Sequence, residues 1–163
     1  MFQDSSAIVG IGETRFARSL APSELELACE AVSLALDDAG IDAAEVDALA
    51  SYTMEDTTEA SLAASMGFGD IVFFSQVGYG GGAGCGAVGQ VAMALAAGMA
   101  EVGVVWRSRK RGDPRSRVWA GVGDRIADHW KWSRPWGLLR PVDEVAMLMR
   151  RYMHEYGATR EAL

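Results

Sequence analysis

The feature of the sequence that most constrains the fold is a glycine-rich stretch between two apolar segments. Seven glycines lie within residues 78–89: Gly78, Gly80, Gly81, Gly82, Gly84, Gly86 and Gly89. An apolar run, 71–77, precedes them, small residues follow as far as Gly98, and a second apolar run covers 102–106. A strand, a glycine turn, a helix and a second strand in this order predict a βαβ unit.

The residues on either side of the glycines indicate how this unit is buried. Consecutive apolar, β-prone residues at 71–74 predict a strand that is internal to the sheet and buried on both faces. Small side chains over 85–97 predict a central helix, packed deep between other layers. Glycine in a helix costs about 0.5–1 kcal/mol relative to alanine. Positive φ angles, or a close approach of the backbone to another backbone or to a ligand, can offset that cost.

The glycine pattern also fits the dinucleotide-binding fingerprint, although one required residue is missing. Residues 84–89 match G-x-G-x-x-G, and residues 78–83 match its variant that ends in alanine. The fingerprint needs a carboxylate at the end of the next strand, about 20 residues on. Here that strand is followed by Arg107, Ser108 and Arg109. The sequence therefore does not favour binding of NAD.

A family resemblance accounts for more of the chain. The run 80–87, the alanine-rich helix after it and the segment 97–105 resemble the nucleophile loop, buried helix and strand of the thiolase superfamily, above all its sterol-carrier-thiolase and lipid-transfer branch. The nucleophilic cysteine of degradative thiolases corresponds in position to Gly81, and Cys85 lies about one helical turn later. The resemblance implies a thiolase-like layered fold, of which this chain matches the amino-terminal half.

Composition narrows the class of protein. The chain has 163 residues, half of them apolar, which predicts one domain with at most an excursion. It has no apolar run near 18 residues and no basic region before an apolar N-terminal segment, so we expect no membrane span and a cytoplasmic location. Cys29 and Cys85 lack metal-type spacing and predict reduced thiols without a metal. A net charge of −7 argues against nucleic-acid binding.

The remaining elements alternate between strands and helices. Residues 7–12 predict the first strand, which in thiolases lies in the middle of the sheet. A helix is predicted from the N-cap Ser23 to Gly40, with Cys29 as a small buried side chain. A strand at 48–52 and a helix over 58–66 follow. The predicted fold class is therefore α/β, a βαβαβαβ half with a mostly parallel sheet and helices on both faces.

The pattern breaks after residue 111, so the predicted domains are an α/β core at 1–111, a Trp- and Arg-rich excursion at 112–140, and a terminal helix at 141–163 that packs back on the core. The excursion is either a functional loop or an aromatic satellite core. In thiolases the corresponding loop domain covers the acyl-CoA pocket. The motif at 150–160 resembles the terminal helix of the family, and the motif at 136–139 resembles the lipid-transfer branch in particular.

The resemblance to this branch implies retro-aldol cleavage of steroid side-chain acyl-CoA thioesters. Glycine at position 81 disfavours thiolysis, because that mechanism needs a thiolate there. The catalytic residues stay unassigned, since the tyrosines given this task in the family lie in the second half. His129 and His154 are candidate bases, although lone helical histidines are more often structural. The alternative is a non-catalytic binding or assembly subunit that completes a thiolase-like fold with a partner chain.

Two segments are candidates for binding the coenzyme A thioester, which is expected as substrate, with no tightly bound cofactor. Backbone N–H groups of Gly80, Gly81, Gly82 and Ala83 can stabilise an oxyanion, unless the glycines serve only helix–sheet packing. Basic residues can hold phosphates, form a solvated face or contact an acidic partner. These residues are Arg107, Arg109, Lys110 and Arg111, with Arg115 and Arg117 beyond them.

The expected partners of the chain are other protein subunits. A half-fold leaves apolar surface uncovered, which invites association. The resemblance implies a homodimer in which residues 73–77 pair antiparallel with those of a second copy. It also implies a hetero-oligomer with a completing or OB-fold subunit.

Overall fold

The computed structural model describes residues 4–17, 19–52, 57–78, 81–110 and 128–162. The chain divides into two compact units, Met1–Gly112 and Asp113–Leu163. Among the predicted features, Gly80 of the glycine segment and Arg111, Arg115 and Arg117 of the basic segment lie outside the described residues.

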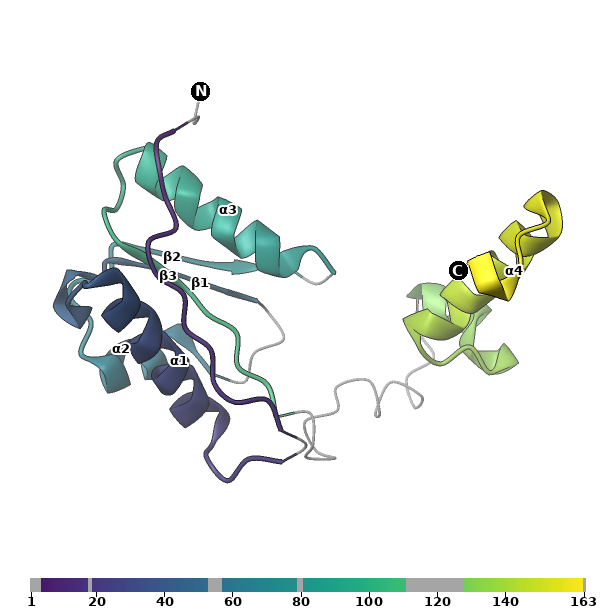
Figure 1. Ribbon diagram of the computed structural model, residues 1–163, viewed down its shortest axis with the longest axis horizontal. Helices are drawn as coiled ribbons and strands as arrows, with labels where there is room; N and C mark the ends of the chain where they lie inside the picture. The colour runs from purple at the N-terminus through teal and green to yellow at the C-terminus, as the bar shows by residue number, and fades with distance from the viewer. Residues whose placement is uncertain (1–3, 18, 53–56, 79–80, 111–127, 163) are drawn as a thin grey trace. The chain divides into compact units, whose positions relative to one another are not determined.

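The first unit is a three-layer α/β structure. Its parallel sheet has the strand order β2-β1-β3, formed by β1 (Ala48–Tyr52), β2 (Phe73–Val77) and β3 (Gly103–Val105). Helix α3 (Ala83–Ala96) covers one face, and α1 (Glu24–Ala39) and α2 (Glu59–Met66) cover the other (Figure 1). The predicted fold class, with parallel strands and helices on both faces, is confirmed.

Local signals at the helix ends act as predicted. The Ser23 hydroxyl accepts a hydrogen bond from the Glu26 N–H at 3.1 Å, and the Glu26 carboxylate accepts one from the Ser23 N–H at 2.7 Å. This reciprocal capping box starts α1. Gly40 and Gly67 end α1 and α2 with φ angles of 68° and 69°, a left-handed conformation that favours glycine.

The core lies on both sides of β1, whose five residues are all buried because the strand has a neighbour on each edge and helices on each face. Toward α1 and α2, the first cluster consists of Ala28, Val32, Leu36, Val46, Leu49, Leu62 and Trp106. Toward α3, the second cluster consists of Ala50, Ala87 and Val91.

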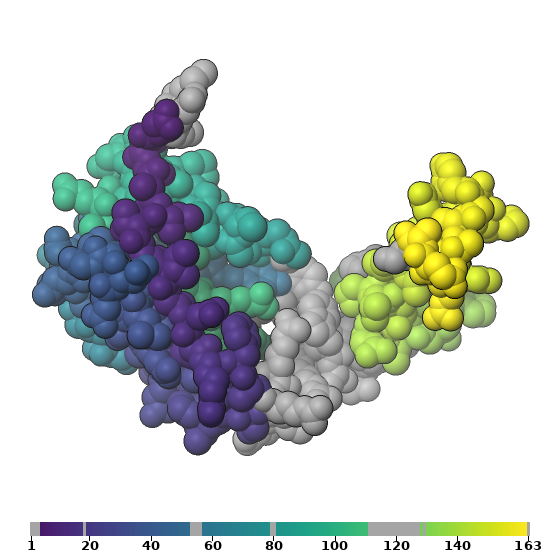
Figure 2. Space-filling model, viewed as in Figure 1, coloured from purple at the N-terminus to yellow at the C-terminus, as the bar shows by residue number. Residues whose placement is uncertain are grey.

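The predicted first strand is wrong. Residues 7–12 form no strand, and β1 pairs directly with β3, with Ala48 opposite Gly103. The segment instead runs over the surface of the unit (Figures 1 and 2). Gly10 lies against α1 so closely that a Cβ atom there would be 2.1 Å from the Ala35 carbonyl oxygen. The Ile11 N–H donates to Asp38 Oδ2 at 3.0 Å, so the segment's polar contact is to the helix.

The predicted burial of the βαβ unit also needs correction. β2 is an edge strand rather than an internal one, and Val72 and Phe74 are 60% and 65% exposed. A continuous apolar run is buried on both faces only where layers cover both, and the outer part of β2 has no such cover. Helix α3 buries Ala83, Ala87, Val91 and Ala94. Its opposite face, with Val88 and Met93, is exposed, so the helix is not deep between layers.

The second unit contains short 3₁₀ turns and one long helix. The turns are η4 (Asp128–Trp132), η5 (Arg134–Trp136) and η6 (Arg160–Ala162), and the helix is α4 (Pro141–Tyr156). Asp143 Oδ2 accepts from the N–H groups of Leu139 and Arg140 at 3.0 and 2.9 Å, and Gly157 ends the helix at φ 66°. The predicted terminal helix begins at residue 141 as expected, and it ends at Tyr156, before residue 163. Its packing on the core stays a prediction.

Candidate functional site

The candidate site is the carboxyl edge of the sheet, where parallel α/β structures place their ligands. The three strands end here at Tyr52, Val77 and Val105. The N-terminus of α3 follows β2, and Arg107 follows β3 at two residues' distance. Apolar runs that form neighbouring parallel strands bring these distant segments to one edge.

The glycines at the start of α3 are not explained by contacts in the described part of the chain. A Cβ atom built on Gly81, Gly82 or Gly84 would meet no atom within 4 Å, and none of the three has a positive φ. Gly86 is the exception, because its Cβ would lie 3.0 Å from Cγ1 of Val77. The space beside the first turn is therefore open to a ligand or to another chain.

This first turn also presents hydrogen-bond donors. Gly82 is the N-cap of α3 and offers no side-chain cap. The first N–H groups of an α-helix have no partner within the helix, and the helix dipole makes this end positive. An anionic oxygen that approaches Ala83 and Gly84 meets free donors of that kind.

A polar cluster joins the ends of β1 and β2. Glu59, the first residue of α2, accepts hydrogen bonds at Oε1 from Ser51 Oγ at 2.6 Å and from Gln76 Nε2 at 2.7 Å. Ser51 is fully buried. This cluster was not predicted, because the position of Glu59 directly after the N-cap Thr58 indicates only the start of a helix.

An exposed cation stands at the same edge. The Arg107 guanidinium lies 5.2 Å from the centre of the Tyr52 ring, within the range of a cation–π contact. Tyr52 itself is buried, while Arg107 is exposed. Tyr52, the last residue of β1, thus lies against the charged group of Arg107, whose side chain is exposed to solvent.

The other described residues of the basic segment are bound to the start of α1. Arg109 Nη1 lies 3.6 Å from Glu24 Oε2, with side chains only 9% and 11% exposed. The Lys110 N–H donates to Glu24 Oε1 at 2.7 Å, and Ser108 Oγ donates to the Glu24 carbonyl at 2.6 Å. The structure therefore separates Arg109, which is paired with Glu24, from Arg107 at the sheet edge.

The two cysteines belong to the first unit, and the two histidines belong to the second. Cys85 is exposed in the first turn of α3, and Cys29 is partly buried against the first core cluster. His129 lies in η4, and His154 is exposed in the last turn of α4. Within the described ranges, no group of three or more His, Cys, Asp or Glu residues could hold a metal ion. Among those same residues, no helix has the length and apolar character needed to cross a membrane.

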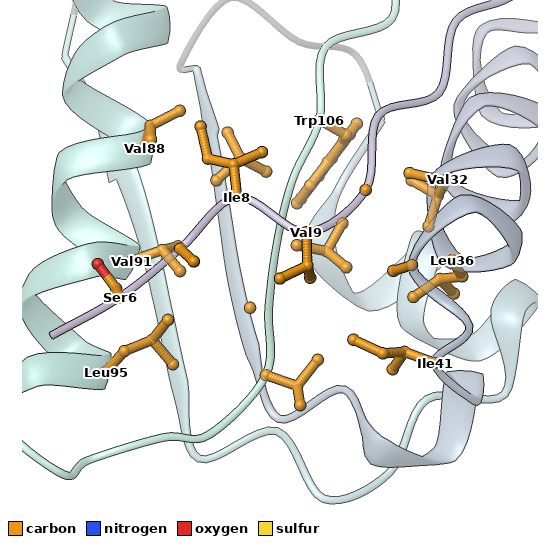
Figure 3. A pocket seen from close by; sticks show the side chains of 18 of the residues that line it. Ser6, Ile8, Val9, Val32, Leu36, Ile41, Val88, Val91, Leu95 and Trp106 are labelled. Carbon is orange, nitrogen blue, oxygen red and sulfur yellow. The ribbon is translucent and has the colours of Figure 1, made fainter. Parts of the chain in front are cut away.

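A cavity of about 1030 Å³ lies elsewhere in the first unit, between residues 5–12, α1, α3 and β3. Figure 3 shows Ile8 and Val9 between side chains of α3 and α1. The lining is mostly apolar, and Trp106, which is 5% exposed, leaves its indole N–H there without a hydrogen-bond partner. Ile8 and Val9 belong to the lining and are 74% and 60% exposed.

Comparison with known proteins identifies the relatives of the chain. No family model matches it. A curated protein of Thermomonospora curvata, "Steroid side-chain-cleaving aldolase", is 48% identical over 165 residues, which cover 96% of this chain and 41% of that protein. The "17-hydroxy-3-oxo-4-pregnene-20-carboxyl-CoA lyase" of Mycobacterium tuberculosis is 42% identical over 165 residues, covering 98% of this chain and 42% of the lyase.

A solved structure agrees with these relatives. The "Ltp2-ChsH2(DUF35) aldolase" superposes with a TM-score of 0.79 and 45% identity, over 94% of this chain and 39% of that one. The chain is a homologue of the thiolase-like steroid side-chain aldolases. The resemblance to the lipid-transfer branch of the thiolase superfamily is thereby confirmed. This homologue spans 41% and 42% of the length of the curated relatives it matches.

Proposed function

We propose that this chain provides the amino-terminal part of an acyl-CoA aldolase that cleaves a steroid side chain by retro-aldol chemistry. The observation that carries the proposal is its 48% identity, over 96% of the chain, to a protein named steroid side-chain-cleaving aldolase. The relative named as a carboxyl-CoA lyase supports a coenzyme A thioester as the substrate.

The proposed reaction needs no cysteine nucleophile. A base takes the proton of a β-hydroxyl group, the carbon that bears the oxygen becomes a ketone, and the bond between the α- and β-carbons breaks. The electron pair of that bond remains on the α-carbon as the thioester enolate, which a proton then quenches. Glycine at position 81 suits this route, because no acyl-cysteine forms. The base is not assigned among the residues of this chain.

The carboxyl edge would serve the thioester in two ways. Backbone N–H groups of the glycine segment, Gly80, Gly81, Gly82 and Ala83, would stabilise the enolate oxygen at the positive end of α3. The open space at Gly81 and Gly82 supports this role. Arg107, with Arg109, Lys110 and Arg111, would attract the phosphates of coenzyme A. Among the described cations, the exposed position of Arg107 at the edge supports this role, whereas Arg109 is paired with Glu24.

A second candidate is a non-catalytic subunit that completes a thiolase-like fold with another polypeptide. The partner would be a second copy, paired through the free edge of β2, together with a completing or OB-fold subunit. The name of the similar solved structure, which joins two proteins, supports a hetero-oligomer.

The two candidates predict different results in one assay. The purified chain is incubated with a steroid β-hydroxyacyl-CoA, alone and after co-expression with the carboxyl-terminal part of a relative, and the ketone product is measured. Turnover by the chain alone excludes the assembly role. Turnover that appears only with the second polypeptide supports it. An inactive reconstituted complex that contains both polypeptides would contradict the aldolase proposal.

A further inference from the structure

One carboxylate oxygen connects three secondary-structure elements at the carboxyl edge. Ser51 and Gln76 lie opposite each other in the parallel pairing of β1 with β2. Both side chains donate to the same atom, Glu59 Oε1, at 2.6 and 2.7 Å. Glu59 belongs to α2, so the two strands and the helix are tied at one point, which we call the Glu59 tether.

The two hydrogen bonds of the tether differ in exposure, since the one from Ser51 is partly buried and the one from Gln76 is exposed. Hydrogen bonds to an ionised carboxylate are roughly twice as strong as those between neutral groups. The Ser51 hydroxyl has no access to water, since the residue is fully buried, and therefore depends on Glu59 as its acceptor. Glu59 also lies in the first turn of α2, where the helix dipole favours a negative charge.

Within the described residues, β2 is an edge strand that pairs with β1. A side chain at Gly78, Gly81 or Gly82 would meet no neighbour within 4 Å, so these positions have no close neighbour on that side. Val77, at the end of β2, lies against Gly86 in α3, so a displacement of this strand end would also displace the start of the helix. The end of β2, where Gln76 is held, therefore contributes to the position of the first turn of α3, which also packs on β1.

We propose that Glu59 is a positioning residue, which fixes the carboxyl end of β2 and thereby helps to position the first turn of α3. The carboxylate acts through Gln76 and Ser51 and contacts no reacting atom. The acyl-CoA role of the segment rests on the proposed function, whereas the tether itself does not.

Amide hydrogen exchange of the full chain tests the tether directly. The variant Glu59→Ala removes both hydrogen bonds, and we expect exchange over Gln76, Val77 and the first turn of α3 to rise by about ten-fold or more, as for local opening of a strand end. Glu59→Gln keeps an acceptor oxygen and should restore most of the protection. The matched control is Glu45→Ala, which removes a carboxylate bond to the Asp42 N–H, 3.0 Å long, before the start of β1.

Three results would overturn the proposal: unchanged exchange in Glu59→Ala, the same local increase in Glu45→Ala, or no restoration by Glu59→Gln. If Glu59→Ala does not fold, Gln76→Ala removes one arm of the tether and should produce the same local increase at smaller size.

Kinetics of the reconstituted enzyme then separate the tether from the proposed function. We expect Glu59→Ala to lower kcat more than it raises KM, because the enolate site is displaced, while Glu45→Ala leaves both unchanged at a matched loss of melting temperature. Local exchange that increases without any change in kcat or KM would retain the tether and contradict the catalytic role of the glycine segment.

Discussion

Gly103 of β3 lies so close to Val91 of α3 that there is no room for a side chain at position 103. A Cβ atom on Gly103 would lie 2.2 Å from Cγ1 of Val91 and 3.6 Å from Cβ of Ala48. Val91 is 5% exposed and belongs to the second core cluster. The absence of a side chain on Gly103 thus sets the distance between α3 and the sheet.

The first prediction follows from this contact. Gly103→Ala should lower the free energy of unfolding by about 1–3 kcal/mol, because an extra methyl group overpacks the core. Gly89 in α3 is the matched control, since nothing lies within 4 Å of its Cβ position. Gly89→Ala should raise stability by about 0.5–1 kcal/mol through helix propensity. Urea unfolding measures both, and equal effects would contradict the close contact.

The second prediction concerns the glycine segment. Gly81→Ala should reduce turnover of the reconstituted enzyme and leave its melting temperature unchanged, because the new methyl group enters open space where the thioester is expected. Gly86→Ala should instead lower the melting temperature, since its methyl group would lie 3.0 Å from Val77. A loss of stability without loss of turnover in Gly81→Ala would favour packing as the reason for glycine at that position.

The third prediction separates two arginines of the basic segment. Arg107→Ala should weaken binding of free coenzyme A with little effect on stability, because Arg107 is exposed at the sheet edge. Arg109→Ala should lower the free energy of unfolding by about 1–3 kcal/mol, because it leaves the Glu24 carboxylate, only 11% exposed, without its cation. Calorimetric titration at low and moderate salt checks the first variant. Affinity that does not depend on salt would count against a phosphate contact.

The fourth prediction concerns pH. The N–H and the hydroxyl of Ser23 stabilise the charged form of Glu26 and hold its pKa below the usual 4.5. A lowered pKa in the folded state means that this contribution is present above pH 4.5 and is lost as the pH falls through the folded pKa. Titration by NMR should show the pKa of Glu26 rising only part of the way to 4.5 in Ser23→Ala, because the N–H remains. A complete return would contradict the larger effect of the backbone.

Local features of the fold could be predicted, whereas features set by neighbouring elements could not. Ser23, Gly40 and Gly67 act within one or two turns, so their capping roles follow from the sequence. The exposure of Phe74 depends on strand order, and a continuous apolar run does not encode that order. Residues 7–12 have a strand-like composition, but their contact through Gly10 with α1 is tertiary.

In the candidate site too, residue types could be predicted from the sequence, whereas contacts between distant residues could not. Arg107 and the glycines could be predicted because their residue types suggest phosphate and oxyanion binding. The Glu59 tether could not, because it unites Ser51 and Gln76, which are far apart in the sequence and common in structural roles. The pairing of Arg109 with Glu24 could not be predicted either, since charge alone does not identify the partner.

The last prediction is that the chain associates through the free edge of β2. This strand is paired on one side only, and Val72 and Phe74 expose apolar side chains beside its unpaired backbone groups. Such an edge favours pairing with another strand, and antiparallel pairing with a second copy would cover both side chains. Phe74→Asp should weaken this association, because a charge would be buried at the contact. The control Phe16→Asp should not, since Phe16 is 88% exposed and lies outside the sheet. Light scattering, after intact-mass measurement, gives the oligomeric state, and a compact monomer at micromolar concentration would defeat the prediction.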